Sequence, residues 1–332
     1  MSGRARVALV LVVVALALGP LFLTPVPPSE WVPELWGSSF GEPRGWALTL
    51  RELTPLLIGG VAVWLALRAG LFNIGAEGQM LVGACATGAV ALAPAFPGQL
   101  VIAIAAGVLA GALWALPAGA LRTFRGGHEV ISCIMLNQLA FLLTGWLVKG
   151  PMKDPNAGGA TTKMLDESLR WAPIAKFGRA ELDWALPLGL ALMVGLWYWR
   201  KHRVGGYELE AVGTNATAAR FAGIPAEMVQ FRAFAMSGGL AGLAGALLVV
   251  ADQNRFYDGM TSGKGFDSLG VALLAGANPL ALAPSALLFA ALNAATTGMN
   301  QIGIPKGLSG LMLGGLTLLF ASASQRKDNA HE

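Results

Sequence analysis

The sequence has little charge for its length. Only 13% of its 332 residues are Asp, Glu, Lys or Arg, whereas 55% are hydrophobic. A soluble domain carries about 25% charged residues, so a chain with half that share lacks the side chains to cover a water-facing surface. The low charge excludes an ordinary soluble fold, although the length alone would suit about two soluble domains. It predicts a protein whose outer surface faces lipid.

Side chains that form redox, metal or covalent catalytic sites are also scarce. The two cysteines, Cys85 and Cys133, lie inside apolar runs, and the three histidines lack the spacing of metal ligands. A Walker A loop is missing, because the nearest string, GMTSGK at Gly259–Lys264, has one residue too few between its glycines and Gly265 after the lysine. We therefore expect no metal, no bound cofactor, no ATP hydrolysis on this chain and no enzyme activity.

Basic residues give the chain a net charge of +4, but they form no single patch that would bind nucleic acid. They lie in short loops between apolar runs, as they do on the cytoplasmic side of membrane proteins. Four cation-rich groups fall on one side of the membrane if the chain crosses it ten times. These are Arg4 with Arg6, Arg122 with Arg125, Arg200, Lys201, Arg203 and Arg220, and Arg326 with Lys327. We expect both termini in the cytoplasm and no nucleic-acid partner.

Ten hydrophobic segments divide the chain. They are Val7–Val26, Leu53–Leu67, Glu77–Phe96, Leu100–Leu121, Val130–Val148, Trp184–Trp199, Ala233–Ala251, Phe266–Ala277, Ala281–Thr297 and Ile304–Ala321. The first segment could be a cleaved signal peptide or an uncleaved helix. It is longer than the apolar core of a cleaved signal peptide, so we interpret it as an uncleaved helix. Leu53–Leu67 and Phe266–Ala277 are shorter than the roughly 20 residues that cross a bilayer. Each is either longer than its apolar part or a broken helix.

We predict an all-α, polytopic membrane protein of about ten transmembrane helices, with a single domain over residues 1–332. The first half covers about residues 7–148, a periplasmic loop residues 149–183 and the second half about residues 184–321, which includes a cytoplasmic loop at residues 200–232. Because five spans is an odd number, two similar halves would be inverted relative to each other. Weak sequence similarity between segments of the two halves favours such a repeat. The alternative explanation of this similarity is the composition that membrane helices share.

Small residues recur at a spacing of four along several segments. The pairs are Gly107 with Gly111, Gly238 with Gly242, and Gly310 with Gly314. Such pairs let helices approach closely in lipid, where no hydrophobic force drives helices together. They predict a tightly packed bundle.

The segment Gly70–Gln79, GLFNIGAEGQ, carries polar residues at the edge of an apolar run. Asn73, Glu77 and Gln79 lie among three glycines that loosen the backbone. Non-helical backbone at membrane depth is tolerated where it lines a cavity or is buried in protein. One interpretation is a broken helix beside a substrate path. The other is that Glu77 caps a helix start or pairs with a cation such as Arg68.

Two asparagines in the apolar segments are further candidates for a substrate path. Asn137 lies well inside the fifth span and Asn293 is deeply placed in the second half. A hydrogen bond between helices is the structural alternative for Asn137. At the cytoplasmic end of the fifth span, Glu129 is expected to pair with Arg122 or Arg125.

The cytoplasmic loop at residues 200–232 contains a predicted short helix, Ala216–Phe221. Asn215 or Thr214 can cap its start, and Gly223 with Pro225 ends it. A compact helix in the longest cytoplasmic loop suits a docking surface for a partner protein. A helix that lies among lipid headgroups is the alternative.

Three segments resemble the permease subunits of bacterial ABC importers for nucleosides, within the wider group of ribose and branched-chain amino acid permeases. They are GLFNIGAEGQ at 70–79, EVISCIMLN at 129–137 and ELEAVGTNATAARFAGI at 208–224. They are long and occur in the family's order, and the resemblance runs from about Leu50 to Ala321. Sugar and vitamin importers share similar permeases.

The resemblance implies a set of partners. Such permeases have about ten spans in the bacterial cytoplasmic (inner) membrane and pair with a second permease, here expected as a heterodimer. The pair binds an ATPase subunit that holds the ATP, and an extracellular lipid-anchored protein delivers the substrate.

The resemblance also implies residue roles. A coupling helix that contacts the ATPase falls on Thr214–Ile224. The matched residues are Thr214, Asn215, Ala216, Ala219, Arg220, Gly223 and Ile224. The NIGAEGQ segment lies near the translocation path in such proteins, which would place Asn73, Glu77 and Gln79 there.

We therefore expect a membrane-spanning permease that moves a nucleoside or related small polar solute and is driven by ATP on a partner. An uncharged solute needs only amide and hydroxyl groups along its path, which Asn73, Asn137 and Asn293 can supply. A permease for a simple sugar or a vitamin is one alternative. An alternative of another class is an ion-coupled secondary transporter, for which Glu77 is the only reasonable acid.

Overall fold

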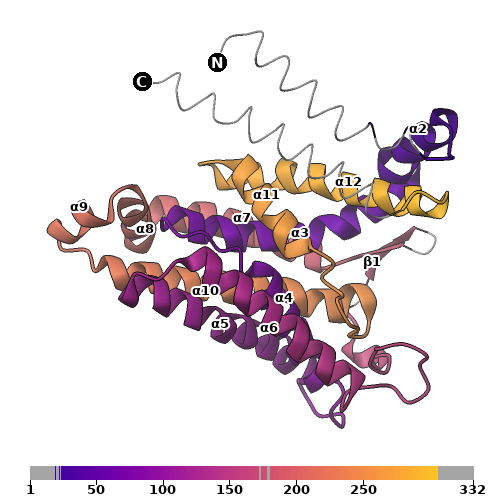
Figure 1. Ribbon diagram of the computed structural model, residues 1–332, viewed down its shortest axis with the longest axis horizontal. Helices are drawn as coiled ribbons and strands as arrows, with labels where there is room; N and C mark the ends of the chain where they lie inside the picture. Colours follow the sequence, from indigo (N-terminus) through magenta and orange to yellow (C-terminus); the bar gives the residue numbers. More distant parts are fainter. Residues whose placement is uncertain (1–18, 20–21, 23, 172, 178–179, 306–332) are drawn as a thin grey trace. The chain divides into compact units, whose positions relative to one another are not determined.

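The computed structural model describes residues 19, 22, 24–171, 173–177 and 180–305 (Figure 1). The predicted spans Val7–Val26 and Ile304–Ala321 fall almost entirely outside these residues. The chain divides into two compact units, and each is described by itself. The first unit comprises Met1–Leu53, Lys176–Leu182 and Pro284–Glu332, and the second comprises Thr54–Ala175 and Asp183–Ala283.

The described part of the first unit is mainly helical. It contains α2 (Pro28–Trp36), the π-helical turn η2 (Gly37–Gly41), the start of α3 (Pro43–Arg68) and most of α12 (Leu282–Gln301). The Ser39 hydroxyl donates a hydrogen bond to the carbonyl oxygen of Ala291 at 2.9 Å, and the Thr49 hydroxyl donates to the carbonyl of Ser39 at 2.9 Å. These bonds fasten η2 between α3 and α12.

The second unit contains most of the described helices (Figure 1). After the rest of α3 come α4 (Ala76–Ala91), α5 (Gln99–Arg125), α6 (Glu129–Lys149), α7 (Ala185–His202), α8 (Val204–Thr214), α9 (Ala216–Phe221), α10 (Ala226–Leu247) with its π-helical extension η4 (Leu248–Gln253), α11 (Lys264–Ala275) and the 3-10 turn η5 (Pro279–Ala281).

Five described helical segments are long and apolar enough to cross a membrane. They are Pro43–Arg68, Gln99–Arg125, Glu129–Lys149, Ala226–Gln253 and Pro279–Gln301. The prediction of a mostly helical, multi-pass membrane protein is confirmed. The two short predicted spans have different outcomes, because α3 is longer than its apolar part, whereas α11 has only 12 residues. At 1.5 Å per residue, α11 measures about 18 Å, well short of the roughly 30 Å hydrocarbon core.

Other segment boundaries differ from the sequence expectation for local reasons. The predicted span to Phe96 stops as helix at Ala91, because Pro94 and Pro97 cannot continue it. Helix α8 was not expected in the cytoplasmic loop, since its glycines disfavour helix. The predicted loop at 149–183 also contains structure, namely the 3-10 turn η3 (Glu167–Leu169) and two paired strands, β1 (Pro173–Phe177) and β2 (Ala180–Asp183).

Helices α4, α5 and α10 form the core of the second unit, and they cross at glycines (Figure 1). A Cβ atom at Gly111 of α5 would collide with the carbonyl oxygen of Gly238 of α10, and one at Gly242 with that of Gly107. Gly83 of α4 lies against both Gly242 and Gly107. The close packing predicted from the first two glycine pairs is confirmed, and the third pair lies outside the described residues.

Candidate functional site

The segment between α3 and α4 is a break in the helical backbone, as the glycines predicted. Gly70 has φ = +75°, in the region that glycine adopts readily, and the chain remains non-helical until α4 begins at Ala76. Asn73 is fully buried and Gln79 nearly so. The break therefore lies inside protein, and its polar groups need partners there.

Asn73 and Gln79 satisfy each other across the break. The Asn73 amide nitrogen donates to the Gln79 side-chain oxygen at 2.8 Å, and the Gln79 amide nitrogen donates back to the Asn73 side-chain oxygen at 3.0 Å. Asn73 also donates to the Ser237 hydroxyl at 2.8 Å, which in turn donates to the carbonyl of Ala62 at 2.6 Å. One buried network thus joins the break to α3 and α10.

Asn137 of α6 supports the same break from the other side. Its side-chain oxygen accepts a hydrogen bond from the Gly78 backbone N–H at 2.9 Å, and its amide nitrogen donates to the carbonyl of Ile74 at 3.0 Å. These are backbone groups that the interruption of the helix leaves without helical partners. Asn137 therefore makes a bond between helices, the structural alternative considered from the sequence.

The Glu77 carboxylate, fully buried, binds the start of another helix. It accepts hydrogen bonds from the Thr261 hydroxyl at 2.6 Å, from the Gly263 N–H at 3.0 Å and from the Gly265 N–H at 2.7 Å. These groups begin α11, so the negative charge lies at the positive end of that helix dipole. Arg68, the suggested partner, instead lies 3.8 Å from Glu210. The sequence indicated that Glu77 could cap a helix start, but not that this helix would be α11.

The four path candidates of the second unit therefore already have protein partners. A solute that contacted Asn73, Gln79 or Asn137 through the same atoms would have to displace a hydrogen bond. Asn293, the fifth candidate, lies on α12 in the first unit and is half-buried. Its carbonyl oxygen accepts hydrogen bonds from the hydroxyls of Thr296 at 2.8 Å and Thr297 at 3.1 Å.

The predicted short helix in the cytoplasmic loop is present as α9, and Asn215 caps it. The Asn215 side chain accepts a hydrogen bond from the Ala218 N–H at 3.0 Å, whereas the Thr214 hydroxyl donates to the carbonyl of Glu210. Gly223 has φ = +85° just after the helix, the conformation that favours glycine at a helix end. The sequence signals for this helix were therefore sufficient.

The residues matched to the coupling role divide between the inside and the outside of α9. Ala216, Ala219 and Ile224 pack inward on Val212 and Ala226. Arg220 pairs with Glu227 at 3.2 Å. Phe221, which sequence reasoning missed, projects outward with 89% of its surface exposed. A lone aromatic residue among small ones was the available signal.

Helix α8 fastens α9 to the long helices. Glu210 accepts a hydrogen bond from Arg200 of α7 at 2.6 Å, and Arg200 also donates to the carbonyl of Ala277 after α11 at 3.0 Å. The backbone at Gly213 approaches the carbonyl oxygen of Arg68 so closely that a Cβ atom there would collide with it. Movement of the α8–α9 hairpin would therefore act directly on the ends of α3, α7 and α11.

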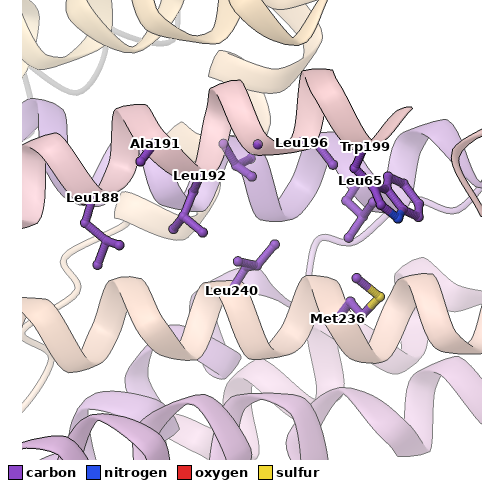
Figure 2. A pocket seen from close by; sticks show the side chains of 10 residues that line it. Leu65, Leu188, Ala191, Leu192, Leu196, Trp199, Met236 and Leu240 are labelled. Carbon is purple, nitrogen blue, oxygen red and sulfur yellow. The ribbon is translucent and has the colours of Figure 1, made fainter. Parts of the chain in front are cut away.

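Figure 2 shows a cavity between α7, α10 and α3 whose lining is apolar. Its volume is about 360 Å³, and Leu188, Leu192 and Trp199 of α7 face Met236 and Leu240 of α10 across it. A polar solute needs convergent hydrogen-bonding groups in its site, and this lining offers almost none. The cavity is unsuited to a nucleoside or a sugar.

Comparison with known proteins identifies the family of this chain. Residues 47–321 match the family described as the permease component of branched-chain amino acid transport systems. A guanosine ABC transporter permease of Bacillus subtilis is 31% identical over 96% of this chain and 93% of its own length. A glucose ABC transporter permease of Haloferax volcanii is 29% identical over 95% and 86%. A nucleoside ABC transporter permease of Lactococcus lactis is 30% identical over 82% and 78%. The chain belongs to this family of ABC transporter permeases.

Proposed function

We propose that this chain is the membrane-spanning permease of an ATP-driven importer and forms the translocation path for a nucleoside. Two relatives at 30% identity or more are named as guanosine and nucleoside permeases. As a transport subunit of an ABC system, the chain is not itself an enzyme, and ATP hydrolysis belongs to a separate subunit.

The observation that carries the proposal is the α8–α9 hairpin. Phe221 offers a large apolar side chain that is 89% exposed in the described structure, while Ala219 and Ile224 pack on the inner side of the helix. Exposed aromatic side chains of this kind anchor protein interfaces. Because Glu210 ties the hairpin to Arg200 of α7, closure of ATPase domains bound at α9 would move the ends of the long helices. That link would produce alternating access by rocking of packed helices.

The remaining partners and the membrane arrangement follow from this proposal. A second permease subunit completes the path, most simply as a heterodimer, and an extracellular lipid-anchored protein delivers the solute. The chain lies in the bacterial cytoplasmic membrane with ten spans, two inverted five-helix halves and both termini in the cytoplasm. The location of cation-rich groups beside the hairpin, such as Arg200 and Lys201, supports this orientation.

A sugar or vitamin is the second candidate solute. A glucose permease of Haloferax volcanii and a probable riboflavin permease of Treponema pallidum are relatives at 29% and 27% identity. Both solutes, like nucleosides, are polar and can be bound by amide and hydroxyl groups. Uptake measured with each solute in turn would decide among them.

The ion-coupled alternative depended on Glu77. Its carboxylate accepts three hydrogen bonds at the start of α11. An acid that releases and binds a proton in every transport cycle would have to break and reform this cap each time. The cap therefore favours a structural role for Glu77 and ATP as the energy source.

The hairpin can be tested by changing its two exposed aromatic residues separately. Phe221→Ala should abolish co-purification of an ATPase subunit with the tagged chain and abolish ATP-dependent uptake. Tyr207→Ala is the matched control, since Tyr207 is 68% exposed but lies on α8. Retention of the ATPase by the Phe221 variant at the wild-type level would refute the docking role.

A further inference from the structure

Helix α6 is marked at both ends by charged pairs. Glu129 is the first residue of α6, and its carboxylate lies 3.1 Å from the Arg122 guanidinium, the pairing expected from the sequence. Lys149 is the last residue of α6, and its ammonium lies 2.5 Å from the Asp258 carboxylate. Charged groups of this kind mark the polar boundaries of a membrane span. Gln138 lies nine residues after Glu129 and eleven before Lys149. At 1.5 Å per residue it is about 14 and 17 Å from the two ends, near the middle of the membrane.

Gln138 lies on the outward face of α6, where its neighbours are apolar. Met135 and Leu142, one turn to either side, are each 61% exposed. Gln138 is also exposed, and its amide makes no hydrogen bond to any residue that the structure describes. An amide in contact with hydrocarbon loses its hydrogen bonds to water and gains none, which is costly. Lipid is therefore a poor neighbour for this face.

The adjacent helix α5 shows what a face suited to lipid looks like. Its exposed residues from Val101 to Leu121 are all apolar, and apart from Ile102 they follow a spacing of four. They are Val101, Ile102, Ala105, Leu109, Leu113, Pro117 and Leu121. Leu113, close to the middle of α5, is 64% exposed. The two helices thus expose similar amounts of surface at the same depth but differ in one polar residue.

We propose that the outward face of α6 is a wall of the translocation path and that the Gln138 amide hydrogen-bonds the solute in the middle of the membrane. A carboxamide presents one acceptor and two donor hydrogens side by side. It therefore matches a neutral solute that carries a donor beside an acceptor, as the edge of a nucleobase does. The inference rests on the proposed function and names a specificity-determining residue for it. Asn137, about 100° away around the helix, faces into the protein and holds the break before α4.

Access of water to this face can be measured without any transport assay. Single cysteines would replace Gln138, Leu113 or the buried Ala140 in a chain that carries Cys85→Ala and Cys133→Ala, assembled in its complex in native membranes. A charged thiol reagent needs water and a thiolate, so we expect Gln138→Cys to react at least about tenfold faster than Leu113→Cys and Ala140→Cys. Guanosine should slow only the reaction at position 138.

Either of two results would overturn the proposal. One is that Gln138→Cys reacts as slowly as Leu113→Cys, which would mean that lipid or protein covers the face. The other is fast labelling that guanosine does not change, which would mean a wet surface that the solute does not visit. The labelling rate and its response to guanosine can both be measured whether or not ATP hydrolysis is coupled to transport.

A transport measurement separates this proposal from the proposed function. Gln138→Leu should raise the half-saturating guanosine concentration about tenfold, the equivalent of one lost hydrogen-bonding contact, with an unchanged amount of co-purified ATPase. Gln138→Asn should restore part of the loss. A wild-type complex that imports no nucleoside would refute the nucleoside assignment, whereas normal uptake by Gln138→Leu would refute only the role of Gln138.

Discussion

Two neighbouring polar residues of α6, Asn137 and Gln138, differ in whether the protein satisfies their hydrogen bonds. Asn137 faces inward and both ends of its amide are bonded, to the Gly78 N–H and to the Ile74 carbonyl. Gln138 faces outward among apolar side chains, and its amide has no hydrogen bond within the described structure. The sequence presents the pair as two consecutive amides in an apolar run, so only the geometry distinguishes them.

The difference separates two reasons for a polar residue at membrane depth. A buried polar group whose hydrogen bonds are all made within the protein holds the architecture, as Asn73, Glu77 and Asn137 each do. A polar group that projects from the protein without a partner has to be satisfied by water, solute or another subunit. Measurements of stability and of transport should therefore respond to different residues.

The largest expected effect on stability is at Glu77. Glu77→Leu leaves the buried Thr261 hydroxyl, the buried N–H of Gly265 and the half-buried N–H of Gly263 without an acceptor. Each such group costs about 1–3 kcal/mol, so we expect a loss of about 3 kcal/mol or more in the free energy of unfolding. Thermal unfolding of the detergent-purified complex measures it. Glu77→Gln should lose less, since it keeps an acceptor oxygen, and a Leu variant as stable as the wild type would contradict the cap.

The next effect compares the two amides of α6 directly. Asn137→Leu should lower the free energy of unfolding by about 1–3 kcal/mol, because the Gly78 N–H and the Ile74 carbonyl lose their partner. Gln138→Leu should change it by less than about 0.5 kcal/mol, since no hydrogen bond within the described structure is lost. The same thermal unfolding assay reports both. Equal losses for the two variants would remove the distinction between the faces.

The last effect is local and is expected at the cytoplasmic hairpin. Asn215→Ala removes the cap of α9 and should cost about 1 kcal/mol locally. Hydrogen exchange at the Ala218 amide, which donates to Asn215, should become several-fold faster while global unfolding is nearly unchanged. Thr214→Ala is the control, because its hydroxyl bonds the Glu210 carbonyl instead. Exchange at Ala218 that is unaffected by Asn215→Ala would show that packing of Ala219 alone holds the helix.

Local sequence signals predicted the local features of the fold well. The apolar runs gave the long helices, Asn215 and Gly223 gave the limits of α9, and the glycine pairs gave the crossing of α5 with α10. Each of these depends on residues within one or two helical turns, so spacing alone carries the information. Helix α8 is one exception, because Gly205 and Gly206 disfavour helix, and the strands β1 and β2 in the predicted loop at 149–183 are another.

The partners of the buried polar groups could not be predicted, because they come from distant parts of the chain. Glu77 was expected to cap its own helix or to meet Arg68, and it binds residues 184 to 188 positions away. The direction in which Gln138 and Phe221 project also depends on which faces the neighbouring helices cover. Periodicity gives the angle between two side chains on one helix, but not which of them is covered.

The cap on α11 has a consequence for the order in which the chain is made. The ribosome synthesises Glu77 well before Thr261, which follows 184 residues later. At about 5–20 residues per second, the carboxylate waits roughly 10–40 s before the groups that bind it exist. During that interval the Glu77 carboxylate of α4 lacks these hydrogen-bond donors, and burying it in lipid without them is energetically costly. Stable insertion of α4 should therefore be a late event of biogenesis, completed only after α11 has left the ribosome.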